Sequence, residues 1–141
     1  MIVLDTNVIS EIFRARPDPG VMAWLQALEG DVAITAVTMA EMWAGIGRLP
    51  AGARKDALAA RVGAAIEPYR GSGSVLPFDD AAAVHYADVL VSRDRAGAPI
   101  SMADAQIAAI CRAHGATCAT RSVKDFADTG ISLVDPWAPQ P

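Results

Sequence analysis

The sequence predicts an α/β domain built on a mainly parallel β-sheet. Short apolar segments alternate with helix-like segments along the chain, a pattern typical of such sheets. The 141 residues are 52% apolar and 20% charged, which suits a globular protein with a substantial core. We expect one domain that covers residues 1–141.

Five short strands are expected where apolar residues run between turn-forming residues. They cover residues 2–5, 31–35, 74–78, 117–119 and 131–134. The first strand ends on Asp5. Because sites in open parallel sheets lie outside the carboxyl ends of the strands, Asp5 occupies a position where a site is expected.

Helices are expected over residues 7–14, 19–30, 37–48, 53–67, 79–95 and 101–114, with one helical turn over residues 122–126. Asp18 and Pro19 form a helix start, a capping carboxylate followed by proline at the first helical position. Ser101 caps the last long helix, which ends at Gly115. Pro68 and the Gly-Ser-Gly segment at residues 71–73 are expected to end the helix that begins at residue 53.

The net charge of −4 argues against a protein that binds nucleic acid through its overall charge. Basic residues occur in small groups, such as Arg93 with Arg95 and Arg121 with Lys124, which we interpret as solvated surfaces. We find neither a secretory signal nor an apolar stretch of about 18 residues that could span a membrane. We therefore expect a cytoplasmic protein with no membrane partner.

Zinc and disulfide chemistry are not indicated. The two cysteines, Cys111 and Cys118, form neither a disulfide framework nor a zinc cluster, and they suit a reducing compartment. His85 and His114 are far apart in the sequence and have no metal-ligand spacing.

Asp104 is out of place on its helix, because it shares one stripe with Ile107, Ala108 and Cys111. A carboxylate on an apolar stripe is costly unless it is paired or binds a metal. A structural alternative is equally consistent, since Ser101 and Asp104 have the spacing of a capping box.

Two further carboxylates also have structural alternatives. Glu41 lies beside the apolar stripe of its helix, among small residues, but it could pair with Arg48. Asp125 follows the fourth strand by a few residues, but it could be an ordinary surface aspartate beside Lys124.

Asp5, Glu41, Asp104 and Asp125 together indicate a metal site. A doubly wound sheet can bring them to one rim, where four carboxylates tolerate one another only with a cation between them. Oxygen ligands suit Mg²⁺ or Mn²⁺. Such ions activate water and stabilise charge on a phosphodiester, so the set predicts metal-dependent phosphodiester hydrolysis.

Three segments carry a resemblance to a known family: MIVLDTNVISE at the start, AVTMAE at residues 36–41 and PISMADAQIAAICRAHGATCATRSVKDF at residues 99–126. The chain resembles the PIN-domain ribonucleases, especially the toxins of VapBC-type toxin–antitoxin modules in the FitB-like branch. The resemblance covers nearly the whole chain. It implies a PIN-like three-layer α/β/α sandwich with a Mg²⁺- or Mn²⁺-dependent acidic cleft that cuts RNA.

The resemblance also implies residue roles. The catalytic, metal-binding carboxylates fall on Asp5, Glu41, Asp104 and Asp125, and the supporting polar residues on Thr6, Asn7, Thr120 and Ser122. Asn7 would orient a carboxylate or a water. Ser122 departs from the family, which usually has asparagine there. Serine is shorter and lacks the amide, so we expect weaker support near Asp125.

The resemblance implies RNA as substrate, a cognate antitoxin whose C-terminal segment fills the cleft, a homodimer, and operator DNA bound only through the antitoxin. One alternative is a catalytically weak or silent PIN-fold partner that modulates a DNA-binding antitoxin. Its groove would use Ile12, Phe13, Trp24 and Trp43, unless these residues belong to the core. A receiver-like phosphoacceptor is disfavoured, because Asp5 has no acidic neighbour in the sequence.

Overall fold

Five parallel strands form one sheet in the computed structural model, which describes residues 1–140. The strands are β1 (Ile2–Leu4), β2 (Val32–Thr35), β3 (Val75–Leu76), β4 (Thr117–Ala119) and β5 (Leu133–Val134). Their spatial order is β3-β2-β1-β4-β5, with every pair parallel. The predicted parallel α/β fold is therefore confirmed, although several strands are shorter than expected.

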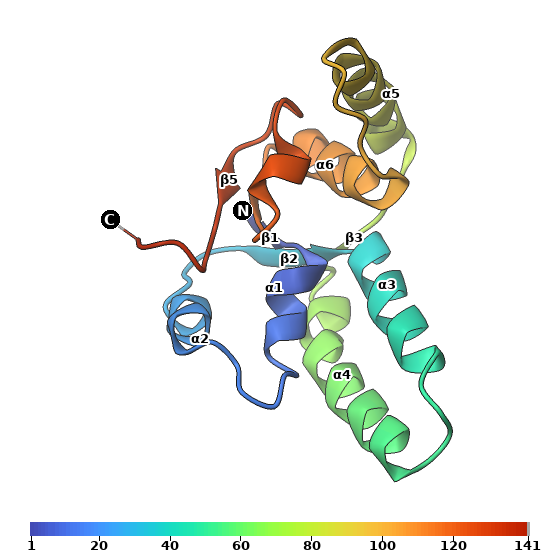
Figure 1. Ribbon diagram of the computed structural model, residues 1–141, viewed down its shortest axis with the longest axis vertical. Coiled ribbons are helices and arrows are strands. Elements are labelled where there is room, and N and C mark those ends of the chain that lie inside the picture. The colour runs from blue at the N-terminus through green and yellow to red at the C-terminus, as the bar shows by residue number, and fades with distance from the viewer. Residues whose placement is uncertain (141) are drawn as a thin grey trace.

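Helices cover both faces of this sheet. They are α1 (Thr6–Glu11), α2 (Pro19–Gln26), α3 (Ala36–Gly47), α4 (Ala53–Gly71), α5 (Asp80–Arg95) and α6 (Met102–His114), with a 3₁₀ turn, η1 (Val123–Phe126). Figure 1 shows the sheet between α5 and α6 on one side and α1, α3 and α4 on the other. This is the three-layer arrangement that the resemblance implied.

The alternation of side chains along each strand separates two cores. Val3 and Cys118 are buried in the core beneath α5 and α6. Leu4 and Ala119, the next residues, are buried in the core beneath α1, α3 and α4. Because successive strand residues point to opposite faces, each short strand supplies both layers, which explains its nearly continuous apolar run.

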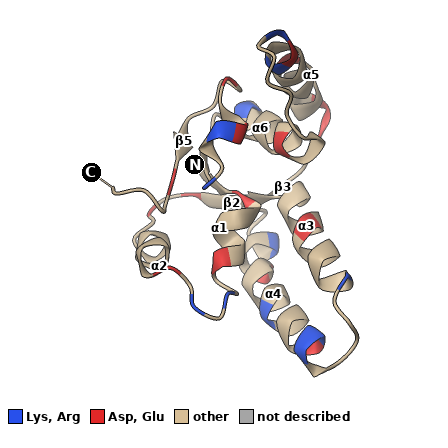
Figure 2. Cartoon of the chain, viewed as in Figure 1, with Lys and Arg blue, Asp and Glu red and all other residues tan. Residues whose placement is uncertain are grey.

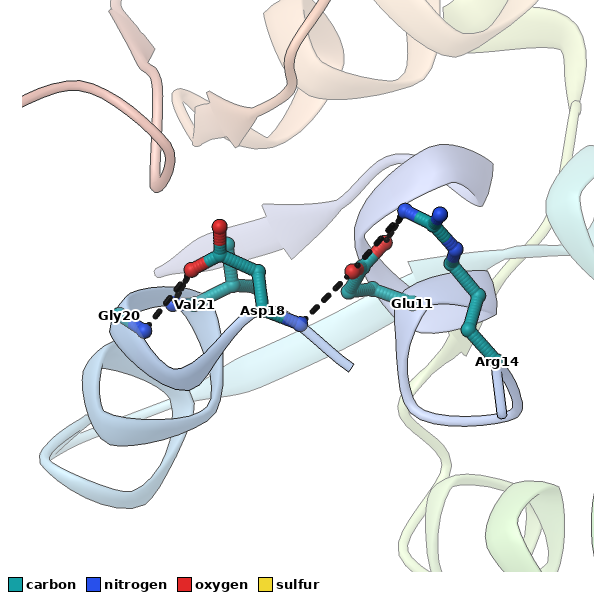
Figure 3. Close-up of polar contacts among 5 residues, drawn as sticks. All are labelled: Glu11, Arg14, Asp18, Gly20 and Val21. Carbon is teal, nitrogen blue, oxygen red and sulfur yellow. Dashed lines mark hydrogen bonds and ion pairs between the residues drawn. The ribbon is translucent and has the colours of Figure 1, made fainter. Parts of the chain in front are cut away.

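Glu11 joins the end of α1 to the start of α2 (Figure 3). Its buried carboxylate accepts a hydrogen bond from the Asp18 backbone N–H at 2.9 Å and lies 3.2 Å from the Arg14 guanidinium. Asp18 caps α2 as expected, accepting from the N–H groups of Gly20 and Val21 at 2.8 and 3.1 Å. These contacts fix the connection between the two helices.

Of the two features expected to end the helix that begins at residue 53, Pro68 does not end it, whereas the segment 71–73 does, because α4 continues to Gly71. Proline removes only one backbone donor, here close to the end of the helix, where the last carbonyl groups find other partners. Ser72 donates from its hydroxyl to the Pro68 carbonyl at 2.8 Å, and the Ser74 N–H donates to the Tyr69 carbonyl at 2.7 Å. The glycine and serine residues that follow therefore close the helix.

The four apolar residues considered for a partner-binding groove differ in how far they are exposed. Ile12, Phe13 and Trp24 are partly buried and pack against the core beneath α1, α3 and α4. Trp43 is 40% exposed. No helix within residues 1–140 combines the length and the apolar character needed to cross a membrane.

Candidate active site

The candidate site lies where the strand order reverses direction. β1 and β4 are neighbours in the sheet, with Leu4 paired to Ala119, and the connections leave this pair toward opposite edges. Asp5 and Thr120 follow these strands directly, and the Asp5 N–H donates to the Ala119 carbonyl at 2.9 Å. In parallel α/β sheets, such a switch point is where ligands bind.

Asp5 is buried and held from two sides. The Thr6 N–H donates to its Oδ1 at 2.8 Å, so Asp5 also caps α1. The Thr120 hydroxyl donates to its Oδ2 at 2.7 Å. Burial raises the pKa of Asp5, the two hydrogen bonds lower it, and the charges of Asp104 and Glu41 raise it again. The carboxylate is therefore oriented but costly to ionise, as expected of a group that meets a cation.

Asn7 joins the two strand ends through its amide. Its Nδ2 donates to Ser122 Oγ at 3.1 Å and lies 3.4 Å from Thr120 Oγ1, while its Oδ1 accepts from the Arg121 N–H at 3.3 Å. The Ser122 N–H in turn donates to Thr120 Oγ1 at 3.0 Å. The structure thus brings together Asn7, Thr120 and Ser122, and Ser122 still reaches Asn7 despite its shorter side chain.

Glu41 reaches this site from α3 through Thr6. Thr6 Oγ1 lies 2.8 Å from Glu41 Oε1 and 3.0 Å from the buried Thr38 hydroxyl. Glu41 itself is exposed. Within residues 1–140 it forms no ion pair with Arg48, so the alternative role in pairing is not realised.

Asp104 lies in the first turn of α6, half-buried above the residues of its apolar stripe. Ser101 caps the helix, its Oγ accepting from the Asp104 N–H at 3.2 Å. The capping role predicted for Ser101 is therefore confirmed. Burial is the main cause that raises the pKa of Asp104; the Ser101 contact lowers it, Asp125 and Glu41 raise it, and Arg93 lowers it.

Asp125 lies on η1 and is exposed. Its backbone carbonyl accepts a hydrogen bond from Arg93 at 2.6 Å, and the same guanidinium donates to the carbonyl groups of Ala127 at 3.0 Å and Ala98 at 2.5 Å. Arg93 is buried, so its interpretation as a solvated residue is wrong. The sequence around Arg93 gives no sign that this arginine binds backbone carbonyl groups.

Each of the four carboxylates is close enough to at least one other for their charges to interact. In Figure 2, acidic positions are visible on α3, α6 and η1. The charge of Glu41 contributes to the raised pKa values of both Asp5 and Asp104, and the charge of Asp125 contributes to that of Asp104. Within residues 1–140, however, no three of the His, Cys, Asp and Glu side chains already converge on one point as a metal cluster.

The donor set nevertheless fits a small hard cation. It consists of carboxylate oxygens, the ligands that Mg²⁺ and Mn²⁺ prefer. Mg²⁺ keeps several waters and needs only one or two direct carboxylates, so a wide acidic site suits it. Burial and, after it, the neighbouring carboxylates raise the pKa values of Asp5 and Asp104, and a cation would offset this repulsion.

An apolar cavity of 240 Å³ adjoins the acidic site between α1, α3 and α4. Thr6 and Glu41 line its acidic end. Phe13, Met42 and Leu58 line its apolar part. The cavity could hold an apolar side chain of another molecule, next to a carboxylate that attracts positive charge.

Comparisons with known proteins agree with this architecture. The family model for the PIN domain matches residues 2–131. The VapC ribonuclease Y4jK of Sinorhizobium fredii is 41% identical over 140 residues, which are 99% of each chain. Toxin FitB of Neisseria gonorrhoeae is 39% identical over 138 residues, 97% of this chain and 99% of FitB. The structure of FitAB bound to the IR36 DNA fragment superimposes with a TM-score of 0.93 at 39% identity, covering 100% of this chain and 99% of that one.

Proposed function

Because the chain belongs to the PIN-domain family, we propose that it is a metal-dependent endoribonuclease, the toxin of a type II toxin–antitoxin module. The observation that carries this proposal is the buried Asp5 at the switch point, fixed by Thr6 and Thr120 with further carboxylates around it. The similarity to a VapC ribonuclease and to a toxin supports this activity.

The residues divide the catalytic work. Bound Mg²⁺ or Mn²⁺ would supply an activated water and neutralise charge at the phosphodiester. Asp5 and Asp104 would hold the ion directly, and Glu41 and Asp125 would reach it directly or through water. Thr120 and Thr6 keep Asp5 in one orientation, and Glu41 is positioned by the same Thr6 hydroxyl.

Asn7 and Ser122 would stabilise the position of Thr120 and, through it, of Asp5. The Asn7 amide spans the turn after β4 and contacts Thr120, which holds Asp5. The amide therefore limits how far the end of β4 can move from the end of β1. Changing such indirect contacts typically costs about 10- to 100-fold in metal affinity or activity.

A cognate antitoxin would restrain the enzyme by occupying the apolar cavity and the acidic site together. The FitAB structure shows a relative assembled with a partner on DNA, and we propose that this chain contacts operator DNA only through its antitoxin. A basic antitoxin side chain beside Glu41 would complement the acidic charge. A homodimer is part of the same proposal, and analytical ultracentrifugation would test it.

The decisive experiment compares cleavage of a mixed RNA pool by the wild type, Asp5→Asn and Asp56→Asn, with Mg²⁺ or Mn²⁺ and with EDTA. Asp56 is an exposed aspartate in the first turn of α4 and matches the charge change outside the site. We expect Asp5→Asn to lower the rate about 100-fold or more, as for loss of a metal-holding group. Asp56→Asn should cleave like the wild type.

Either result has a clear consequence. Full activity of Asp5→Asn, or cleavage that persists in EDTA, would refute the metal-dependent mechanism. A folded wild type that cleaves no RNA but still binds the antitoxin would favour the alternative of a silent partner. Circular dichroism of each variant would establish that the fold is intact.

A further inference from the structure

Arg121 and Trp137 form a cation–π pair at the edge of the sheet that carries the candidate site. The Cζ atom of Arg121 lies 5.1 Å from the centroid of the Trp137 ring. Arg121 closely follows β4 and Trp137 closely follows β5. Because these strands are parallel neighbours, both residues lie at the carboxyl end of the sheet, with Asp5.

The backbone of Arg121 is fixed relative to the acidic site. Its N–H donates to Asn7 Oδ1 at 3.3 Å. The residue before it, Thr120, donates to Asp5 at 2.7 Å. One peptide unit therefore separates Arg121 from the residue that orients the central carboxylate.

Trp137 provides a firm support for the guanidinium. The ring is partly buried against the core beneath α1, α3 and α4. Its backbone N–H donates to Asp135 Oδ1 at 2.9 Å, and Gln140 Nε2 donates to the carbonyl groups of Asp135 and Ala138, each at 2.8 Å. The turn that presents the ring is thus held by its own hydrogen bonds.

The charge of Arg121 is available to a ligand. The residue is exposed, and of the ion pairs formed within residues 1–140 none includes it. Arg93, by contrast, is buried and donates hydrogen bonds to backbone carbonyl groups. An arginine stacked on a ring keeps its in-plane N–H groups available, and their fork matches the oxygens of a phosphate.

We propose that Arg121, held over Trp137, binds a backbone phosphate of the RNA chain next to the one that is cleaved. This proposal rests on the proposed function, since it concerns the substrate of that site. The net charge of −4 makes such a local cation important, because acidic surfaces repel RNA and phosphate contacts dominate its affinity. Trp137 positions the cation and lowers the entropy lost when RNA binds.

The test measures binding of a fluorescently labelled single-stranded RNA in EDTA, by anisotropy over a range of salt concentrations. Arg121→Gln should weaken binding roughly 5- to 10-fold at low salt. It should also reduce the slope of log affinity against log salt by about 0.7, the loss of one phosphate contact on a single strand. Arg70→Gln is the matched control, because Arg70 is an exposed arginine that precedes β3 at the opposite end of the sheet.

A second pair of variants tests the role of the ring. Trp137→Leu should lower RNA affinity about 3-fold, in line with a cation–π contact at an exposed site, whereas Trp137→Phe should bind nearly like the wild type. Melting temperatures would show whether either variant is unfolded. Because Phe retains a ring beneath Arg121, recovery of binding in this variant separates positioning from general loss of structure.

The outcomes separate this inference from the proposed function. If Arg121→Gln binds RNA like the wild type, or if Arg70→Gln weakens binding equally, Arg121 is no phosphate contact, even if cleavage still requires Asp5 and metal. If cleavage requires neither Asp5 nor metal, the proposed function fails, and the salt slopes still decide whether Arg121 binds RNA.

Discussion

The hydroxyl of Thr120 lies 2.7 Å from Oδ2 of Asp5, joining two residues that are 115 positions apart. The contact connects the end of β4 to the end of β1, and both side chains are buried. Thr120 Oγ1 also accepts the Ser122 N–H at 3.0 Å. One hydroxyl therefore orients the central carboxylate and closes the turn that follows β4.

Replacing Thr120 by valine should weaken metal binding while keeping the shape of the side chain. Asp5 would lose the donor that favours its ionised form, so its pKa would rise further. We expect affinity for Mn²⁺ to fall about 10-fold, the usual scale for such supporting contacts. Isothermal titration would measure it, and Thr120→Ser, which retains the hydroxyl, should bind Mn²⁺ within about 2-fold of the wild type.

Replacing Asp5 by asparagine should stabilise the protein at neutral pH in the absence of divalent metal. Burial raises the pKa of Asp5 above its ordinary value of 3.8, so the folded state binds the proton more tightly than the unfolded chain. The stability contributed by the neutral form is complete below pH 3.8 and is lost as the pH rises through the folded pKa. Asparagine avoids that loss.

The measurement is the melting temperature of both proteins between pH 4 and pH 7. Asp5→Asn should melt about 3 °C higher at pH 7, which is roughly 1 kcal/mol for a chain of this size, and the difference should shrink toward pH 4. Saturating Mg²⁺ should reverse the order, since a ligand at 100 times its Kd stabilises by about 2.7 kcal/mol. A wild type that gains nothing from Mg²⁺ or Mn²⁺ would contradict a metal site at Asp5.

Arg93 should be essential to the stability of the segment that carries Asp125. Arg93→Met removes the donors for the carbonyl groups of Ala98, Asp125 and Ala127, and leaves them partly buried without a partner. We expect a loss of about 2–4 kcal/mol in the free energy of unfolding. Urea titration would measure it, and Arg95→Met, at an exposed position of the same helix, should cost less than about 0.5 kcal/mol.

The fold and the acidic residues followed from local signals, whereas the contacts between them did not. Apolar runs bounded by turns gave the parallel sheet, and a carboxylate after the first run indicated an edge site. Asp104 was recognisable because it interrupts an apolar stripe. Nothing local, however, couples Thr120 to Asp5, because their proximity depends on the pairing of β4 with β1, two strands that lie far apart in the sequence.

The errors have the same origin in tertiary contacts. Pro68 carries a strong local signal for the end of a helix, but serine and backbone donors beyond it satisfied the carbonyl groups. Arg93 has the sequence environment of a solvated arginine, yet it packs against the turn that carries Asp125. Hydrogen bonds between distant segments leave no periodic trace in the sequence.

Ser122 offers the last test, because the resemblance to the family led us to expect asparagine at this position. Its Oγ accepts from Asn7 Nδ2 at 3.1 Å. Ser122→Ala would leave the Asn7 Nδ2 group with the longer of its two contacts, to Thr120 at 3.4 Å, while Asn7 Oδ1 would still accept from the Arg121 N–H. Loss of one neutral hydrogen bond, about 1 kcal/mol, should lower kcat about 5-fold.

The reciprocal variant is Ser122→Asn, whose amide is longer and offers both a donor and an acceptor. We expect RNA cleavage to increase, because the amide can contact Asn7 and still reach toward Asp125. Ser132→Ala, an exposed serine at the opposite end of the neighbouring strand, is the control and should cleave like the wild type. If Ser122→Ala keeps full activity, the Asn7 contact does not contribute to catalysis. If Ser122→Asn is less active than the wild type, Ser122 does not weaken the active site of this chain.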